Sequence, residues 1–342
     1  MILRLSLNDI KLPDMNLKTQ RPWREIFSHL SPAWFVPIMG WCGLSLIWLQ
    51  APPLGGLNQL LFQSFALFAW GLTLIIYSAY LFRTIRFFDR VVNDLKHPGI
   101  QAMFGAFPIS LLLIAATCWN WFHVAYSWIV FIWIAGALLE LAATVWFVFL
   151  WSKIKTSQGL QTFSPLIFIP VAGHVIVPLA GMPLGFELWS MIQFALGLFL
   201  WPIGLVLIAW RIKKIGAWPE VMSPTWFILV APPSMMGIYF FNWQSPIFVY
   251  LTFGLIALLS LCWAIFQLPR IVQLPFDMPH WAMSFPLTAF TSLALLINRD
   301  ANLSWLHFTA IALLITSTIV IIGLTLFTFW GLYLGRLLAH RT

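Results

Sequence analysis

The sequence has little charge: only 8% of its 342 residues are Asp, Glu, Lys or Arg, whereas 61% are hydrophobic. A typical globular chain is about 25% charged, because its surface must face water. This shortage excludes an ordinary soluble domain and predicts a surface that faces lipid. At roughly 20 apolar residues per span, the length accommodates on the order of ten helices and leaves no room for a soluble catalytic domain.

Cysteines and catalytic motifs are also scarce. The three cysteines, Cys42, Cys118 and Cys262, lie far apart inside apolar runs, so neither a disulfide framework nor a metal cluster is indicated. The water-facing loops contain no phosphate-binding loop, no dinucleotide fingerprint, no histidine pair with zinc-ligand spacing and no Ser/His/Asp arrangement. We therefore expect no enzymatic activity, no cofactor and no bound metal.

Long apolar runs, in contrast, fill most of the chain. They are continuous rather than alternating, which favours membrane-spanning helices over the strands of a barrel. The sequence thus predicts an all-α polytopic membrane protein with ten transmembrane helices. The predicted helices lie at about 33–50, 60–82, 103–121, 126–151, 164–182, 187–210, 224–242, 246–268, 280–297 and 305–335.

The distribution of basic residues orients these helices. The formal net charge is +8, and ten spans place 17 of the 18 Lys and Arg residues on one side, with Arg299 as the exception. By the positive-inside rule that side is cytoplasmic and holds both termini, so the basic excess records topology in a plasma or inner membrane rather than binding of nucleic acid. The expected divisions are a cytoplasmic arm at 1–30, a transmembrane pore domain at 31–336 and a cytoplasmic tail at 337–342.

Proline recurs inside every odd-numbered span. These inner prolines are Pro37, Pro108, Pro170, Pro232 and Pro286. They are separated by 71, 62, 62 and 54 residues, about one helical hairpin each, whereas the even spans contain only Pro202 in their interiors. An interior proline removes a hydrogen bond and bends a helix, which a cavity-lining helix tolerates better than a lipid-facing one. We expect five helical hairpins in a pseudo-five-fold arrangement, with bent odd helices around a central pore and straighter even helices outside.

A family resemblance rests on two segments of the inner helices, Phe168–His174 (FIPVAGH) and Trp281–Leu287 (WAMSFPL). Together with the ten spans and their prolines, over about residues 30–335, they resemble the tellurite-resistance TehA and plant slow-type anion channel family. The resemblance implies a homotrimer in the lipid bilayer with one pore per subunit. It also implies passive conduction of small monovalent inorganic anions, such as chloride and nitrate, and a gate at Phe285.

The proline pattern and the resemblance together give the candidate site residues. Phe285 precedes a proline near the middle of an inner span, where a flat apolar ring could fill a narrow lumen. His174 also lies on an inner span, where it could line the pore or be a core histidine with satisfied hydrogen bonds. The other candidates for lining the pore are Phe35, Pro37, Phe107, Pro108, Pro170, Pro232 and Pro286.

Glu140 is the acidic residue near the centre of a span. Its ionised carboxylate would cost at least about 2.5 kcal/mol there, so it must be protonated, paired or hydrated. One interpretation is a proton-coupling site; the other is a hydrogen bond to a neighbouring helix or subunit. Two transport hypotheses therefore stay open: a passive channel, or a proton-coupled carrier of oxyanions such as tellurite, or of dicarboxylates, that uses Glu140 and His174.

The sign of ion selectivity does not follow from the residues alone. Prolines free backbone carbonyls, which would suit cations, and no inner span carries a Lys or Arg near its middle. No span has arginines at every third position, as voltage sensors do. Anion preference is therefore an expectation from the resemblance, helped only by the basic cytoplasmic loops.

Overall fold

The computed structural model describes residues 27–97, 99–152, 163–301 and 304–337. Within these ranges the chain is almost entirely helical and has no strand, which confirms the predicted all-α class. The predicted cytoplasmic arm and tail, and the basic pair Lys153 and Lys155, fall almost wholly outside the described residues.

Five long helices expose most of their surface. They correspond to the even-numbered predicted spans, and only 22–33% of the most apolar stretch of each is buried. A helix that is apolar yet exposed suits contact with lipid. These outer helices are α3 (Leu57–Arg86), α6 (Ser127–Ser152), α10 (Glu187–Ile215), α12 (Ile247–Phe266) and α15 (Ser304–Tyr333).

Inner elements alternate with these helices along the chain, and each begins as a 3-10 helix that continues as an α-helix. Four of them are long enough to span a membrane, and 72–78% of the most apolar stretch of each is buried. These four are η2–α2 (Pro32–Phe35, Val36–Gln50), η3–α5 (Gln101–Gly105, Ala106–Phe122), η6–α11 (Glu220–Val230, Ala231–Asn242) and η7–α14 (Met278–Met283, Ser284–Ala301).

The fifth predicted span is shorter and interrupted. It is an apolar segment, Pro165–Gly181, divided into η4 (Pro165–Ile167), α8 (Phe168–Ala172), η5 (Gly173–Ile176) and α9 (Pro178–Gly181). Its prolines each lack an amide donor, so the α-helical hydrogen-bond pattern cannot run through it without a break. Over the described ranges, nine helices are therefore long and apolar enough to cross a membrane, and this segment occupies the place of the remaining predicted span.

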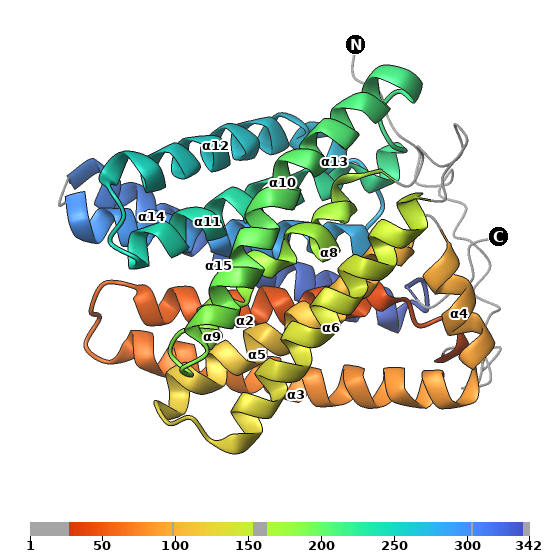
Figure 1. The fold of residues 1–342 in the computed structure, drawn as a ribbon, viewed down its shortest axis with the longest axis horizontal. Helices are drawn as coiled ribbons and strands as arrows, with labels where there is room; N and C mark the ends of the chain where they lie inside the picture. Colours follow the sequence, from red (N-terminus) through yellow and green to blue (C-terminus); the bar gives the residue numbers. More distant parts are fainter. Residues whose placement is uncertain (1–26, 98, 153–162, 302–303, 338–342) are drawn as a thin grey trace, which may run out of the picture.

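The inner elements contact one another in a closed cycle. α2 contacts α5, α5 contacts α8, η5 and α9, η5 contacts α11, α11 contacts α14, and α14 returns to α2. Each outer helix packs on the inner element of its own hairpin, as α3 does on α2 and α15 does on α14. In Figure 1 the outer helices α6 and α10 cross in front of the inner helices. The chain thus separates odd inner elements from even outer helices, as the proline pattern predicts.

Each inner proline lies in the first turn of an α-helix, directly after the 3-10 segment. Pro37 is the second residue of α2, and the amide of Val36 donates to the carbonyl of Ala33, four residues before Pro37. The residue before Pro232 donates in the same way to the carbonyl of Ile228. These two prolines have no N–H to donate to the carbonyl four residues earlier, and the 3-10 hydrogen bonds satisfy those carbonyls instead. The expected bend corresponds to a change of helix type, and these carbonyls are not free to attract cations.

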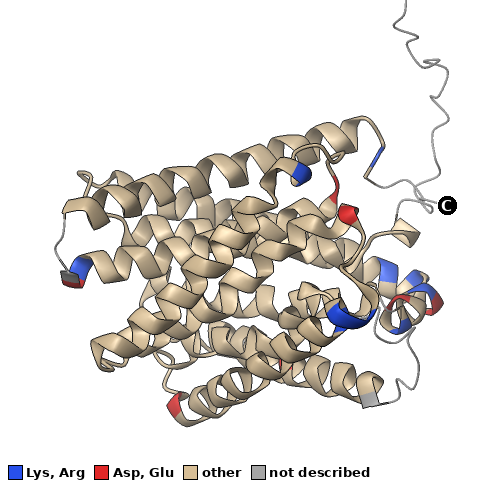
Figure 2. Cartoon of the chain, turned by 90° about the horizontal axis from the view of Figure 1, so that it is seen from above, with Lys and Arg blue, Asp and Glu red and all other residues tan. Residues whose placement is uncertain are grey.

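Lys and Arg residues gather mainly at one end of the molecule (Figure 2). α3 finishes with Arg83 and Arg86, α10 finishes with Lys213 and Lys214, and the inner elements begin at that same end. Arg299 lies in the last turn of α14, at the opposite end. We call these the basic end and the opposite end.

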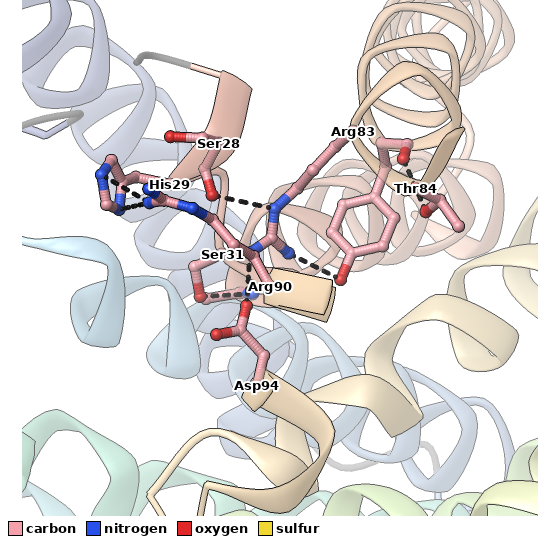
Figure 3. Close-up of polar contacts among 9 residues, drawn as sticks. Ser28, His29, Ser31, Arg83, Thr84, Arg90 and Asp94 are labelled. Carbon is pink, nitrogen blue, oxygen red and sulfur yellow. Dashed lines mark hydrogen bonds and ion pairs between the residues drawn. The ribbon is translucent and has the colours of Figure 1, made fainter. Parts of the chain in front are cut away.

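A buried ion pair holds the entry to the first inner element at the basic end (Figure 3). Arg83 is 2% exposed, and its Nη2 lies 2.6 Å from Oδ2 of Asp94 in the short helix α4 (Phe88–Lys96). The same guanidinium donates to the carbonyl of Ser28 and to the hydroxyl of Tyr80. α3, α4 and the residues before η2 are thereby fixed to one another.

Candidate functional site

Two cavities lie inside the cycle of inner elements. The narrow cavity, of about 50 Å³, is lined from all five inner elements at or near their 3-10 segments, so it lies toward the basic end. The wide cavity, of about 480 Å³, is lined by the later parts of the same elements and lies toward the opposite end. The two spaces together follow the axis of the helix bundle.

Three side chains line both cavities: Val175 of η5, Met235 of α11 and Phe285 of α14. They are buried, with exposed fractions of 3%, 5% and 6%. Because the same three residues border both spaces, they form the partition between the cavities, and we call them the septum. Phe285, the residue that the sequence selects as a gate, is the largest side chain in it.

The walls of the two cavities differ in chemistry, but among the described residues no charged side chain lines either of them. The narrow cavity is apolar, and four methionine side chains contribute to it: Met39, Met103, Met235 and Met278. The wide cavity adds amide and hydroxyl groups from Gln50, Asn120, Asn242, Thr288 and Ser292. An ion that entered the wide cavity would therefore meet hydrogen-bonding groups before the apolar septum.

Glycines on α2 allow Phe285 to occupy the septum. A Cβ atom built on Gly43 would overlap the Thr288 hydroxyl and lie 3.4 Å from the Phe285 ring, and one built on Gly40 would lie 2.6 Å from Ser284 Oγ. The Thr288 hydroxyl itself donates to the Phe285 carbonyl at 2.8 Å. α2 and α14 can thus approach closely only because α2 has no side chains at these two positions.

The other candidates from the sequence divide into two groups. Pro232 and Pro286 line the narrow cavity beside Phe285. Phe35 lines neither cavity, because it packs edge-to-face on Tyr77, Tyr80 and Phe107 at the outer side of its element. Four further candidates also line neither cavity: Pro37, Phe107, Pro108 and Pro170. The sequence did not single out Val175 or Met235, which lie five and three residues after an inner proline and so share no common offset.

His174 points away from both cavities and toward the outer helices. Its Nε2 lies 2.8 Å from the Thr144 hydroxyl of α6, and its Nδ1 is hydrogen-bonded to the Gln193 side chain of α10. The Gln193 amide donates in turn to the carbonyl of Ala137 at 3.0 Å. Of the two roles that the sequence allows for His174, this geometry is that of a core histidine with satisfied hydrogen bonds.

Glu140 lies next to this polar cluster and is completely buried. Neither carboxylate oxygen has a hydrogen-bond partner among the described residues, so of the two hydrogen bonds that the sequence allows, to a neighbouring helix or to a neighbouring subunit, the first is absent there. A Cβ atom on Gly173 would overlap Oε1, and Gly173 itself lines the narrow cavity. The carboxyl group therefore lies directly behind the cavity wall, although α6 is an outer helix.

Comparison with known proteins supports a transport function. A family model described as Voltage-dependent anion channel matches residues 29–329. An uncharacterized transporter of Methanocaldococcus jannaschii is 24% identical over 310 residues, which cover 80% of this chain and 85% of that protein. The S-type anion channel SLAH2 of Arabidopsis thaliana is 24% identical over 250 residues, 65% of this chain and 44% of that protein. The chain thus spans nearly the whole archaeal relative but less than half of the plant channel.

Proposed function

The chain belongs to the voltage-dependent anion channel family, and from this premise we propose that it is a passive channel for small monovalent anions such as chloride and nitrate. The family contains channels and transporters rather than enzymes. The observation that carries the proposal is the pair of uncharged cavities separated by Phe285, Met235 and Val175. In this account anions cross the septum when the Phe285 ring turns aside.

The apolar wall favours conduction over tight binding. An ion must enter a pore easily and leave it easily, and a lumen without fixed charges does not trap a permeating anion. Selection among anions would then follow the cost of removing their hydration water and the width of the septum. We therefore expect weakly hydrated anions such as nitrate to pass more readily than strongly hydrated ones.

Removal of the Phe285 ring tests this function. We expect Phe285→Ala to raise chloride efflux from proteoliposomes at least about tenfold over wild type, because an apolar constriction blocks ions by excluding water. Phe290→Ala is the matched control, since Phe290 lies on the same helix and lines neither cavity. Equal chloride efflux from the two variants, at equal amounts of reconstituted protein, would show that Phe285 is not the gate.

A proton-coupled carrier for oxyanions such as tellurite, or for dicarboxylates, is the second candidate. The unpartnered carboxyl group of Glu140 behind the cavity wall favours it, because that group could take up and release a proton near the transport path. A carrier would accumulate substrate when a pH gradient is imposed, and Glu140→Gln would abolish that accumulation. A channel would equilibrate anions without accumulation, with or without Glu140→Gln.

Assembly and orientation complete the proposal. The resemblance to the TehA and slow-type anion channel family supports a homotrimer with one pore per subunit. The gathering of Lys and Arg residues at one end of the molecule supports a cytoplasmic location for that end (Figure 2). Chemical cross-linking in native membranes, and protease access to a tag at each terminus, would test these two statements.

A further inference from the structure

We propose that Arg299, Gln50 and Ser292 form a capture site for small monovalent anions at the mouth of the wide cavity. The site would collect anions at the end opposite the basic one and pass them toward the septum. This inference rests on the proposed channel function and adds the place at which the anion first binds.

Hydrogen bonds hold both oxygen atoms of Gln50 and leave its side-chain NH₂ group as a donor. The Arg299 guanidinium donates through Nη2 to the Gln50 carbonyl at 2.9 Å, and the Ser292 hydroxyl donates to Gln50 Oε1 at 2.7 Å. Both acceptor atoms of Gln50 are therefore engaged, which leaves the side-chain NH₂ group as a donor. Gln50 and Ser292 line the wide cavity, so Arg299 lies at its rim.

Arg299 forms no ion pair within 4 Å with another residue that the structure describes. Asp300 adjoins it in sequence, but its Oδ2 accepts a hydrogen bond of 2.9 Å from the Tyr250 hydroxyl of α12. In the described part of the chain, the ion pair within 4 Å joins Arg83 to Asp94, at the other end of the molecule. Glu187, the other acid at this end among the described residues, begins α10, which contributes none of the described lining residues of the wide cavity.

The chemistry of the site matches a small anion. A guanidinium has five N–H donors in a planar fork, and one of them is used on Gln50. The remaining donors and the Gln50 amide can replace part of an anion's hydration shell before it reaches the apolar septum. Two hydroxyl groups, of Ser292 and Thr288, then line the path to Phe285. Planar oxyanions such as nitrate fit the guanidinium best, because it can bond two of their oxygens at once.

The test changes the charge at Arg299 within a single open channel. Arg299→Cys is made together with Phe285→Ala and recorded in a planar bilayer, with chloride at about 20 mM so that charge is weakly screened. A cationic and an anionic methanethiosulfonate reagent are then added to one chamber in separate recordings. The channel with Phe285→Ala alone is the control for native cysteines, of which Cys262 is exposed.

We expect the cationic reagent to raise, by about two- to threefold, the current carried by chloride entering from the treated side, and the anionic reagent to lower it. At about 500 mM chloride both effects should shrink toward zero. Equal currents before and after both reagents, once modification of the introduced thiol is verified, would overturn the capture site. No chloride current in the channel with Phe285→Ala alone would instead overturn the proposed function.

Discussion

Arg83 shows how a membrane helix can bury a full positive charge. Its guanidinium is 2% exposed and has three partners: the Asp94 carboxylate, the Ser28 carbonyl and the Tyr80 hydroxyl. The Ser28 contact reaches the segment that leads into η2, whose continuation α2 lines both cavities. The ion pair therefore connects α4, at the surface of the basic end, to the start of an inner element.

The ion pair gives a stability prediction. Asp94→Asn leaves a buried guanidinium without its counter-charge, so we expect a loss of about 1–3 kcal/mol, below the full cost of a broken buried pair because Asp94 is 22% exposed. Thermal unfolding in detergent measures it. Asp89→Asn is the control, because Asp89 lies exposed on the same short helix. Equal shifts for the two variants would show that the pair does not stabilise the fold.

Met235 provides a second prediction at the residue scale. It borders both cavities beside Phe285, so Met235→Ala should widen the septum and give an anion flux between those of wild type and Phe285→Ala. Met236→Ala is a matched control, because this neighbouring methionine is completely buried and lines neither cavity. Chloride efflux from proteoliposomes distinguishes them. A flux for Met235→Ala no higher than for Met236→Ala would exclude Met235 from the septum.

At the scale of the elements, the inner prolines mark where 3-10 helix becomes α-helix. The five 3-10 segments before them are 4, 5, 3, 11 and 6 residues long. A 3-10 helix turns by about 120° per residue and an α-helix by about 100°, so segments of different length rotate the following side chains by different amounts. A residue at a fixed distance from proline therefore faces the axis in one element and an outer helix in another.

This rotation explains why some of the residues selected from the sequence line a cavity and others do not. The hairpin order and the inner position of the odd spans follow from apolar runs and proline spacing, which depend little on helix phase. The direction in which a side chain points depends strongly on helix phase. Pro286 therefore lines the narrow cavity, whereas Pro37 and Pro108 do not. Phe285 was selected because it lies in the segment Trp281–Leu287, which resembles a known family, and not because of its spacing from other residues. No sequence feature distinguishes Val175 or Met235 from other apolar residues, and their position between the cavities follows only from the fold.

The close approach of α2 and α14 gives a prediction for an element pair. A methyl group at Gly43 would overlap Thr288 and contact the Phe285 ring, so we expect Gly43→Ala to cost about 1–3 kcal/mol and to alter flux through the septum. Gly323→Ala is the control, since a Cβ there meets no atom within 4 Å. Thermal unfolding and chloride efflux are measured on the same preparations. If Gly43→Ala and Gly323→Ala had the same unfolding temperature and the same chloride efflux, the close contact between α2 and α14 would be refuted.

At the scale of the whole molecule, the shortage of charge and its distribution have different causes. The outer helices expose apolar surfaces that suit lipid, and no charged side chain lines the cavities within the described part of the chain, which together account for a chain that is only 8% charged. The basic residues that are described lie mainly at one end (Figure 2). The sequence predicts this distribution well, because charge in loops needs no knowledge of packing. It cannot predict the cavities, which arise from contacts between segments far apart in the chain.

The central claim is that anions move passively through one uncharged path that Phe285 closes. Single-channel recording of wild type and Phe285→Ala in a planar bilayer, across a tenfold chloride gradient, tests it most directly. We predict rare openings for wild type and sustained openings for Phe285→Ala, with both currents reversing near the chloride equilibrium potential, about 59 mV from zero. Reversal near the cation equilibrium potential, or no increase in current on removal of the Phe285 ring, would contradict it.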